Sequence, residues 1–284
     1  MSKLQNLIDA RYAGTTPRAL QRDEPQQSNP VIDTLLSHRS VRAFQATPLP
    51  DGTLELLVAA AQSAASSSNL QVWSVVAVRD PARRQRLAAL AGDQAHIREA
   101  PLFLAFLVDV ARLSRVADRA HKPVEGLDYL DTFLMGAIDA ALAAQNAVTA
   151  AESLGLGTVY IGALRNQPEA VARELALTPG LFAVFGLCVG VPDAARPSSV
   201  KPRLAQATVL FHEQYARTPA DCEADIRDYD RAMGDFNRSN RVQTQPQATL
   251  SWSEQSTERL RTAAGLRGRH RLREALQFLG FNLR

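Results

Sequence analysis

The feature that most constrains this chain is its longest apolar segment, which runs from Asp131 to Leu154 at helical spacing. Polar residues interrupt it at four positions: Asp139, Gln145, Asn146 and Glu152. Because polar and charged side chains are costly inside a bilayer, the pattern favours a core helix over a membrane-spanning one, and no membrane partner is expected. The helix should end at Gly155, since glycine favours the left-handed conformation that follows many helices.

Apolar runs rich in β-branched and aromatic residues predict strands at 71–78, 102–108, 158–164 and 182–191. The last run is long enough for a central strand buried on both faces, and a further strand is expected at 207–213. Helices are expected at 31–37, 51–64 (N-cap Asp51 or Thr53), 81–91, 168–175, 220–233 and about 253–279, with 112–126 irregular. Without regular alternation of strands and helices, an α+β fold is favoured over a doubly wound one.

The composition indicates one enzyme-sized globular unit with a sizeable core, since the chain has 284 residues, of which 46% are hydrophobic. A net charge of only +3 does not provide the basic surface that nucleic-acid binding requires, so no nucleic-acid partner is expected. Cys188 and Cys222 form no disulfide framework, and residues 1–30 lack the apolar core of a signal peptide. A cytoplasmic location and an N-terminal arm at 1–30 are therefore expected.

Three glycines in GLGTVYIGA suggest a dinucleotide-binding fingerprint: Gly155, Gly157 and Gly162. That motif requires a strand, a tight turn and then a helix. Here the glycines follow a helix and enter a strand, so the fingerprint is rejected on its context.

A compact donor cluster occupies the sequence His38-Arg39-Ser40-Val41-Arg42, close to the end of a predicted helix. Guanidinium, imidazole and hydroxyl groups in five consecutive residues suit a phosphate group. The alternative is a solvated basic helix end whose cations offset the helix dipole. The residues alone leave both interpretations open.

Two other segments could also bind a ligand, and each has an ordinary structural alternative. Residues 66–73, with sequence SSSNLQVW, place hydroxyls and amides just before a strand, although an ordinary polar loop would have the same composition. Lys201 and Arg203 flank Pro202 and could add two cations to an anion site or simply lie on the surface. None of these segments defines a site by itself.

The segments SHRSVRAF, SSSNLQ, GDQAHI, AAQNAVTAAESLGLGTVYIGALRN and KPRL occur here in the order and approximate spacing of a known family. Over residues 31–284, the chain resembles the NADPH-dependent, oxygen-insensitive nitroreductases and flavin reductases. The resemblance implies a mostly antiparallel sheet flanked by helices, and an intertwined homodimer with two FMN sites at its interface.

Carried over residue by residue, the resemblance assigns the FMN phosphate and ribityl chain to five residues: His38, Arg39, Ser40, Lys201 and Arg203. It places Arg42 and Gln94 at the pyrimidine edge, where a fixed cation would stabilise the negative charge of the reduced ring. The loop that reaches the flavin, in part from the partner subunit, would contain Ser66, Ser67, Ser68, Asn69 and Gln71.

The strand beneath the ring corresponds to Tyr160, Ile161, Gly162 and Ala163, with the Gly162 amide as donor to the ring nitrogen N5. Glycine permits the close backbone approach that this contact needs. Many family members have a second glycine where this chain has Ala163, and we expect the added methyl to be tolerated.

NADPH binding is expected to depend on Arg238 and Arg241, which would contact the 2′-phosphate, although both could be ordinary surface arginines. An apparent insertion, QTQPQATL, follows Arg241 and departs from the family pattern. The expected organisation is an arm at 1–30, an FMN-binding core at 31–236, and a region at 237–284. This last region would contain a mobile NADPH-binding loop and a C-terminal helix packed on the core or the partner subunit.

The resemblance implies ping-pong transfer of hydride from NADPH, as co-substrate, to small-molecule acceptors such as nitroaromatics, quinones or free flavin. The flavin supplies the chemistry, so no protein nucleophile or metal is expected. Four histidines show no ligand spacing and are expected to be structural or solvated: His96, His121, His212 and His270. Two alternatives remain, a flavin-binding sensor or carrier without NADPH turnover, and a nucleic-acid contact through the arginines of the C-terminal segment.

Overall fold

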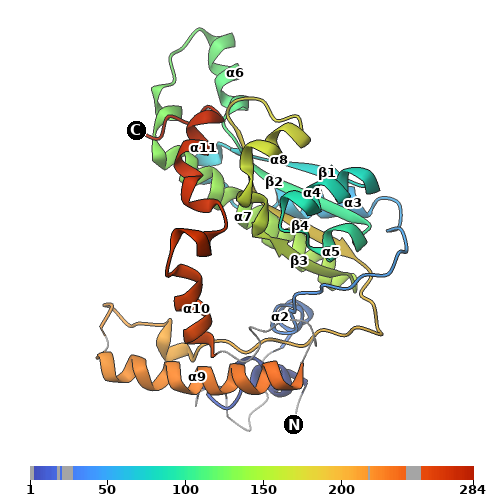
Figure 1. Ribbon diagram of the computed structural model, residues 1–284, viewed down its shortest axis with the longest axis vertical. Helices are drawn as coiled ribbons and strands as arrows, with labels where there is room; N and C mark the ends of the chain where they lie inside the picture. Colours follow the sequence, from blue (N-terminus) through green and yellow to red (C-terminus); the bar gives the residue numbers. More distant parts are fainter. Residues whose placement is uncertain (1–2, 18–19, 21–27, 217, 241–250) are drawn as a thin grey trace. The chain divides into compact units, whose positions relative to one another are not determined.

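The computed structural model describes residues 3–17, 20, 28–216, 218–240 and 251–284, and the chain divides into two compact units. The larger unit contains Ser40–Pro197 and Leu266–Arg284, and the smaller contains Met1–Arg39 and Ser198–Gly265. Figure 1 shows the elements of both units.

The larger unit is built on a four-stranded sheet in the order β1-β2-β4-β3. Its strands are β1 (Trp73–Val78), β2 (Leu102–Asp109), β3 (Gly157–Ile161) and β4 (Leu181–Gly190). Every neighbouring pair is antiparallel. The expected α+β class is confirmed, and the run at 182–191 does form an interior strand.

Strand β2 shows why this sheet needs cover on both faces, because all eight of its residues are buried. Leu102, Leu104 and Phe106 join one apolar cluster, whereas Phe103, Ala105 and Leu107 join another. Successive side chains of a strand point to opposite faces. The sheet therefore separates two cores.

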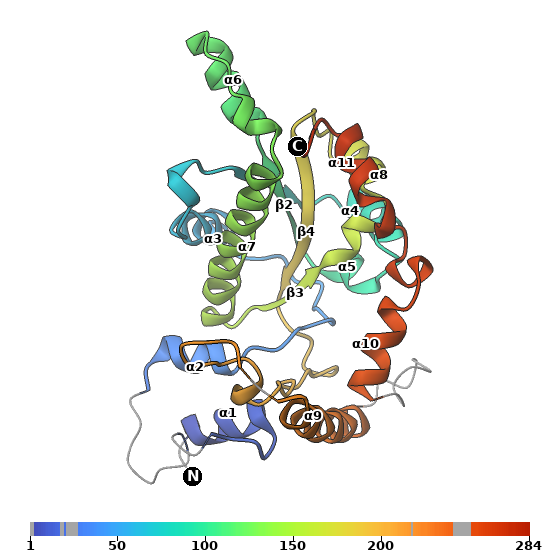
Figure 2. The same cartoon turned by 90° about the vertical axis from the view of Figure 1, so that its left-hand side faces the viewer.

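Helices cover these two faces, as Figure 2 shows. On one face lie α3 (Thr53–Gln62) and α7 (Leu130–Ser153). The other carries α4 (Pro81–Leu90), α5 (Ala95–Glu99) and α8 (Pro168–Glu174). The result is a sheet between two helical layers.

Helix α7 is the expected long helix, and it ends before Gly155, whose φ of +77° is left-handed. By length and composition alone it could cross a membrane, a test that core helices of soluble proteins also pass. Its small residues Ala140, Ala143, Ala144 and Ala147 are fully buried against the sheet. We therefore interpret α7 as a core helix.

Two local expectations fail in this unit. The segment 112–126 was expected to be irregular, but residues Ala111–Ala120 form helix α6 and Glu125–Asp128 a 3-10 turn. Asp109 accepts a hydrogen bond from the Arg112 amide at 3.1 Å and so supports the first turn of α6. The N-cap of α3 is Gly52, with φ +79° and no side-chain cap, instead of Asp51 or Thr53.

The smaller unit is helical, with α1 (Lys3–Tyr12), α2 (Pro30–Leu36), α9 (Pro219–Ser239) and α10 (Trp252–Leu260). The strand expected at 207–213 is wrong, because the chain forms a 3-10 turn at Gln206–Thr208. The Thr208 hydroxyl donates to Asp225 on α9 at 2.8 Å. This stretch is fixed by a helix and not by a neighbouring strand.

The single helix expected at about 253–279 is also wrong, because the chain breaks between α10 and α11 (Leu272–Phe278). Gly268 has a φ of +90°, which side-chain-bearing residues rarely adopt. An added Cβ there would lie 2.5 Å from the Asn166 carbonyl oxygen. Short 3-10 turns at Ala263–Leu266 and Arg269–Arg271 complete the connection.

Candidate functional site

In the smaller unit, the structure brings together two of the segments assigned to the cofactor phosphate. Arg11, on α1, donates hydrogen bonds of 2.9 Å to the carbonyl oxygens of Lys201, Leu36 and His38. The Arg203 amide donates back to the Arg11 carbonyl at 2.8 Å. One guanidinium therefore joins the backbone at His38 to the backbone at Lys201.

The Lys201–Arg203 segment has further supports from α9. The Tyr229 hydroxyl donates to the Pro202 carbonyl at 3.1 Å, and both residues are buried. The ammonium of Lys201 lies 5.8 Å from the centre of the Phe236 ring, within range of a cation–π contact. Lys201 and Arg203 are themselves exposed, so the segment offers two cations on a fixed backbone.

In the larger unit, the Ser40–Arg42 segment lies along the edge of β3. Ser40 forms a parallel bridge with Thr158, and the Val41 amide donates to the Thr158 carbonyl at 2.8 Å. Gly157 makes this approach possible, because a Cβ at that position would lie 2.7 to 2.8 Å from the Val41 side chain. A strand glycine thus sets the position of Ser40 and Arg42.

The two residues assigned to the pyrimidine edge, Arg42 and Gln94, both belong to the larger unit. Desolvation lowers the pKa of the Arg42 guanidinium from its ordinary value, although the residue is exposed overall. Gln94, the other residue assigned to the pyrimidine edge, is the N-cap residue of α5, and its side-chain amide donates to the Ala91 carbonyl at 2.9 Å.

His96, which sequence reasoning left as structural or solvated, lies within the field of Arg42. Burial and then the positive charge of Arg42 lower its pKa to about 4, with Arg98 acting the same way and Glu99 opposing them. Its Nε2 atom is buried and has no hydrogen-bond partner among the described residues. The imidazole is therefore neutral at pH 7, next to a permanent cation.

This shift predicts a pH dependence of stability. Between an unfolded pKa of about 6.5 and the folded value of about 4, the unfolded chain binds the extra proton, so stability falls as pH falls through that window. After a discount for partial exposure, we expect a loss of about 1–2 kcal/mol. Urea unfolding at several pH values should show this slope in the wild type. An equal slope in His96→Gln would rule out this origin.

The loop at residues 66–71 is anchored by a carboxylate that sequence reasoning recognised only as an interruption of an apolar helix. Asp139 on α7 is 1% exposed and accepts from the Ser66 hydroxyl at 2.6 Å and the Ser67 amide at 3.0 Å. The Ser66 hydroxyl oxygen in turn accepts from the Gln71 amide at 2.9 Å. These bonds hold Ser68, Asn69 and Gln71 at positive φ, with all three side chains exposed.

A second support fixes the end of the same loop. Arg112 donates to the Gln71 carbonyl at 2.8 Å and to the Trp73 carbonyl at 3.2 Å. Its guanidinium pairs with the buried Asp109 at 3.1 Å, and Asp109 also accepts from the Ser74 hydroxyl. The loop is thus held at both ends, as a rigid presentation of polar groups requires.

The residues assigned to the strand beneath the ring divide into two kinds. Ile161 and Ala163 are buried in the core, so only their backbone is available to a ligand. Tyr160 is exposed, packs edge-on against Phe185, and its hydroxyl donates to Gln145 on α7 at 3.4 Å. Desolvation raises the pKa of the Tyr160 phenol, which stays protonated.

Gly162 begins the 3-10 turn after β3, and an added Cβ there would meet only the flexible end of Arg165, at 3.4 Å. Its backbone is therefore open to close approach. Among the described residues, no hydrogen bond joins this strand to the loop at 66–71. Both are tied to α7, through Gln145 and Asp139 respectively.

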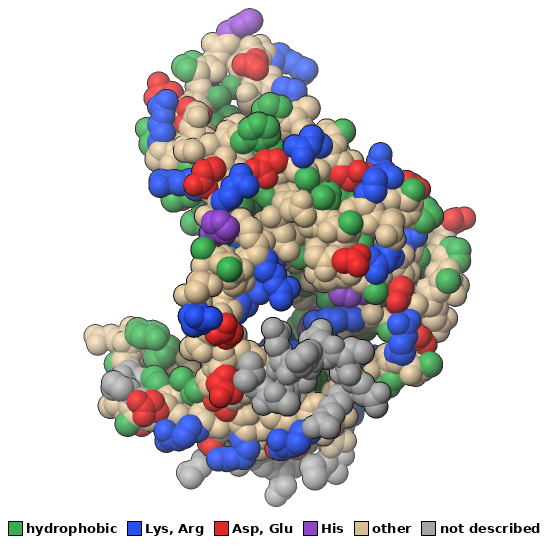
Figure 3. Space-filling model, viewed as in Figure 1, with side chains coloured by type: hydrophobic (Ala, Val, Ile, Leu, Met, Phe, Trp, Pro, Cys, Tyr) green, Lys and Arg blue, Asp and Glu red, His purple; other side chains and the backbone are tan. Residues whose placement is uncertain are grey.

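The two residues predicted to contact NADPH lie only partly within the described structure. Arg238 lies in the last turn of α9, exposed and paired with Asp235. Arg241 lies outside the described residues. Around α9, acidic and basic side chains lie next to one another in Figure 3, and Arg227 and Arg231 pair with Glu223 and Asp228. Such mixed charge differs from the continuous basic surface that nucleic acids require.

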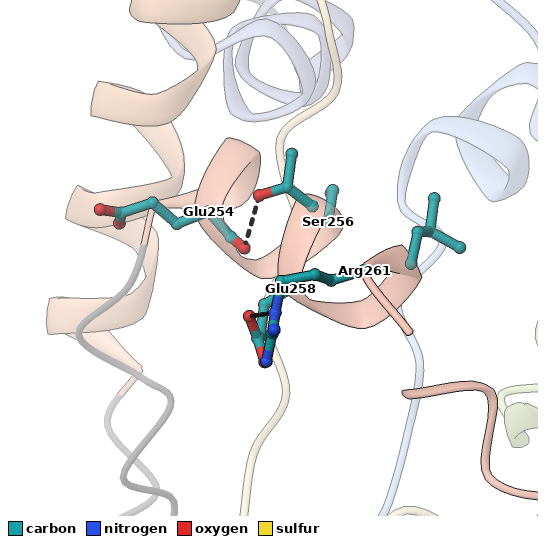
Figure 4. A pocket seen from close by; sticks show the side chains of 6 residues that line it. Glu254, Ser256, Glu258 and Arg261 are labelled. Carbon is teal, nitrogen blue, oxygen red and sulfur yellow. Dashed lines mark hydrogen bonds and ion pairs between the residues drawn. The ribbon is translucent and has the colours of Figure 1, made fainter. Parts of the chain in front are cut away.

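A hollow of about 680 Å³ lies along α10 but involves none of the predicted site residues. In Figure 4, Glu258 and Arg261 point toward each other there and pair at 2.8 Å. The Thr257 hydroxyl is satisfied by the Glu254 carbonyl at 3.1 Å. The ion pair and the Thr257 bond leave none of these three side chains free for chemistry.

The described residues fit a phosphate-bearing flavin. In the smaller unit, the cations of Arg39, Lys201 and Arg203 suit a phosphate. In the larger unit, the exposed groups of the 66–71 loop suit a heteroaromatic edge, and Gly162 permits close approach to a ring. In the larger unit, an antiparallel sheet between two helical layers carries the loop at 66–71 and Gly162. The class that fold and residues define is a flavin-binding α+β protein.

Comparison with known proteins agrees with that class. The model of the nitroreductase family matches residues 35–191, and that of the nitroreductase family C-terminal domain matches 201–284. The chain is 39% identical over 232 residues to the NADPH-flavin oxidoreductase of Vibrio harveyi, covering 82% of this chain and 91% of that relative. It is also 39% identical over 208 residues to an oxygen-insensitive NADPH nitroreductase of Salmonella typhimurium, covering 73% and 82%.

Among solved structures, the NADPH:FMN oxidoreductase of Vibrio harveyi in complex with NAD⁺ matches with a TM-score of 0.78 and 36% identity. The match covers 90% of this chain and all of that one. The chain belongs to the nitroreductase family.

Proposed function

We propose that this chain is an FMN-dependent oxidoreductase that takes hydride from NADPH and passes it to nitroaromatics, quinones or free flavin. The names of its relatives, an NADPH-flavin oxidoreductase and an NADPH nitroreductase, support the cofactor and the co-substrate. The main supporting observation is that Arg11 donates hydrogen bonds to the backbone carbonyls of both His38 and Lys201. These bonds fix the backbone that carries the cations proposed to bind the phosphate.

When bound, FMN supplies the hydride chemistry through its ring, and the protein supplies binding and electrostatics. His38, Arg39, Ser40, Lys201 and Arg203 bind the phosphate and the ribityl chain. Arg42 and Gln94 hold the pyrimidine edge, where the charge of Arg42 favours the reduced state. Ser66–Asn69 and Gln71 orient the ring, and Gly162 donates from its backbone beside Tyr160, Ile161 and Ala163.

The proposed order of events is ping-pong: the oxidised nucleotide leaves before the acceptor enters the same space. Initial rates measured with NADPH against a quinone distinguish this order from its alternative. Parallel lines in the double-reciprocal plot support it. Intersecting lines would show that both substrates bind together and would reject it.

Arg238 is proposed to contact the NADPH 2′-phosphate, together with Arg241. Its exposed pair with Asp235 costs little to break, so the guanidinium is available. Arg238→Ala should raise KM for NADPH about tenfold and leave KM for NADH and the flavin content unchanged. Arg231→Ala, an exposed arginine of the same helix, is the matched control. If Arg238→Ala and Arg231→Ala had the same KM for NADPH, Arg238 would not contact the 2′-phosphate.

We further propose a homodimer, with α7 at its interface. Leu130, Leu134, Ile138 and Leu142 form a line spaced by four residues along α7, and each is 44% to 55% exposed. An apolar stripe of this kind on an otherwise packed helix is typical of a subunit interface. The family resemblance makes a second copy of this chain the partner.

A cytoplasmic location is part of the proposal, and the two cysteines are both free. A flavin-binding sensor or carrier that NADPH does not reduce is the alternative function. Such a sensor or carrier would keep the residues that bind the flavin, but Arg238 would make no contact with NADPH.

A further inference from the structure

Helix α1 contains a buried arginine outside the matched family regions. The two family models begin at residue 35 and at residue 201, so Arg11 belongs to neither. Nevertheless Arg11 is only 8% exposed. Leu4 and Ile8 on the same helix are also buried, at 8% and 3% exposed. Three residues of α1 are thus built into the smaller unit.

The contacts of Arg11 converge on two segments that are far apart in sequence. Its Nη2 donates to the carbonyls of Leu36 and His38, and its Nη1 donates to the carbonyl of Lys201, each at 2.9 Å. The planar guanidinium presents its donors in a fixed fork, which also fixes the spacing of the acceptors. The Arg203 amide adds a fourth bond, to the Arg11 carbonyl.

Other contacts of the N-terminal region hold α1 in place around this arginine. Lys3 pairs with Asp33 on α2 at 2.7 Å, and the Gln206 side chain donates to the Tyr12 hydroxyl at 2.8 Å. Helix α1 therefore contacts both sequence regions that Arg11 joins. The expected arm at 1–30 contains an ordered structural element.

We infer that Arg11 is a positioning residue for the flavin phosphate, acting through the backbone of His38 and of Lys201–Arg203. The inference rests on the proposed FMN binding and adds to it a requirement for α1. A phosphate dianion needs its cationic partners at fixed spacing, since charge-assisted hydrogen bonds depend steeply on geometry. Without Arg11, the two cationic segments separate and bind the phosphate less tightly.

Comparison of two flavins isolates this role, because riboflavin has the ring and ribityl chain of FMN but no phosphate. Flavin-free full-length protein is titrated with FMN and with riboflavin, and quenching of flavin fluorescence gives each Kd. Arg11→Met should raise Kd for FMN about tenfold or more and change Kd for riboflavin by less than about twofold. Arg11→Lys, which keeps the charge but not the fork, should show a smaller selective loss.

Arg227→Met is the matched control, because this arginine is exposed on α9 in the same unit and forms only a 3.8 Å ion pair with Glu223. If Arg11→Met does not fold, Arg11→Lys is judged by the same ratio of the two constants. Unchanged constants for both flavins, or equal losses for both, would overturn the inference. Wild-type protein that binds no FMN would instead reject the proposed function.

Discussion

Replacing Asp139 with alanine should lower the free energy of unfolding by about 2–4 kcal/mol and remove most of the bound flavin. This carboxylate is 1% exposed and accepts from the Ser66 hydroxyl and the Ser67 amide. Alanine would leave both donors without their acceptor. Both bonds are part-buried, and a donor shielded from water that loses its partner costs more than the original bond contributed.

The effect on flavin follows from the conformation that Asp139 imposes. Ser68, Asn69 and Gln71 have φ values of 49°, 54° and 50°, which non-glycine residues adopt at a cost. Their exposed side chains depend on that strained loop for their direction. Once Asp139 is removed, the loop relaxes and the proposed ring contacts are lost.

Two measurements check this prediction: urea unfolding, and the ratio of flavin to protein absorbance after gel filtration. Asp139→Asn keeps one acceptor oxygen and should lose less on both. Asp131→Ala, an exposed carboxylate of the same helix, should change neither by much. If Asp139→Ala matches Asp131→Ala in stability and flavin content, Asp139 does not anchor the loop.

Gly157→Ala should weaken FMN binding about tenfold or more, without any substitution in the cofactor-binding residues themselves. The new Cβ would lie 2.7 to 2.8 Å from the Val41 side chain, a distance that forces Val41 outward. Because the Val41 amide bonds to Thr158, its displacement moves Ser40 and Arg42 with it. The same overpacking should cost about 1–3 kcal/mol of stability.

A double variant tests this cause directly. Val41→Ala removes Cγ1 and Cγ2, two of the three atoms that the new Cβ meets, and leaves the Val41 Cβ at 2.8 Å. Gly157→Ala with Val41→Ala should therefore recover part of the flavin affinity that Gly157→Ala alone loses. Gly126→Ala is a suitable control, since a Cβ there has no neighbour within 4 Å. Additive losses in the double variant would contradict a clash between these two positions.

The fold could be predicted where local pattern and burial agree. Helix α7 and strands β1, β2 and β4 follow from apolar runs, and Gly155 ends its helix as expected. Helix α6 could not be recognised by apolar content, because four of the ten residues in ARLSRVADRA are charged and its start depends on Asp109. The break after α10 depends on Gly268 meeting Asn166, which is about a hundred residues distant in sequence.

The candidate site divides in the same way. The residue types at 38–42, 66–71 and 201–203 indicated where an anion and a ring edge could bind. The residues that position these three segments do so through tertiary contacts, which a local sequence pattern cannot predict. Asp139 gave a signal, a charge in an apolar helix, whereas Arg11 gave none, because its acceptors lie on segments distant in sequence.

The most direct test of the central claim is the visible spectrum of the purified protein under anaerobic conditions. We expect an oxidised flavin spectrum that disappears when NADPH is added and returns when a quinone follows. A flavin spectrum that stays unchanged with excess NADPH, and equally with NADH, would contradict the oxidoreductase function and favour the sensor or carrier.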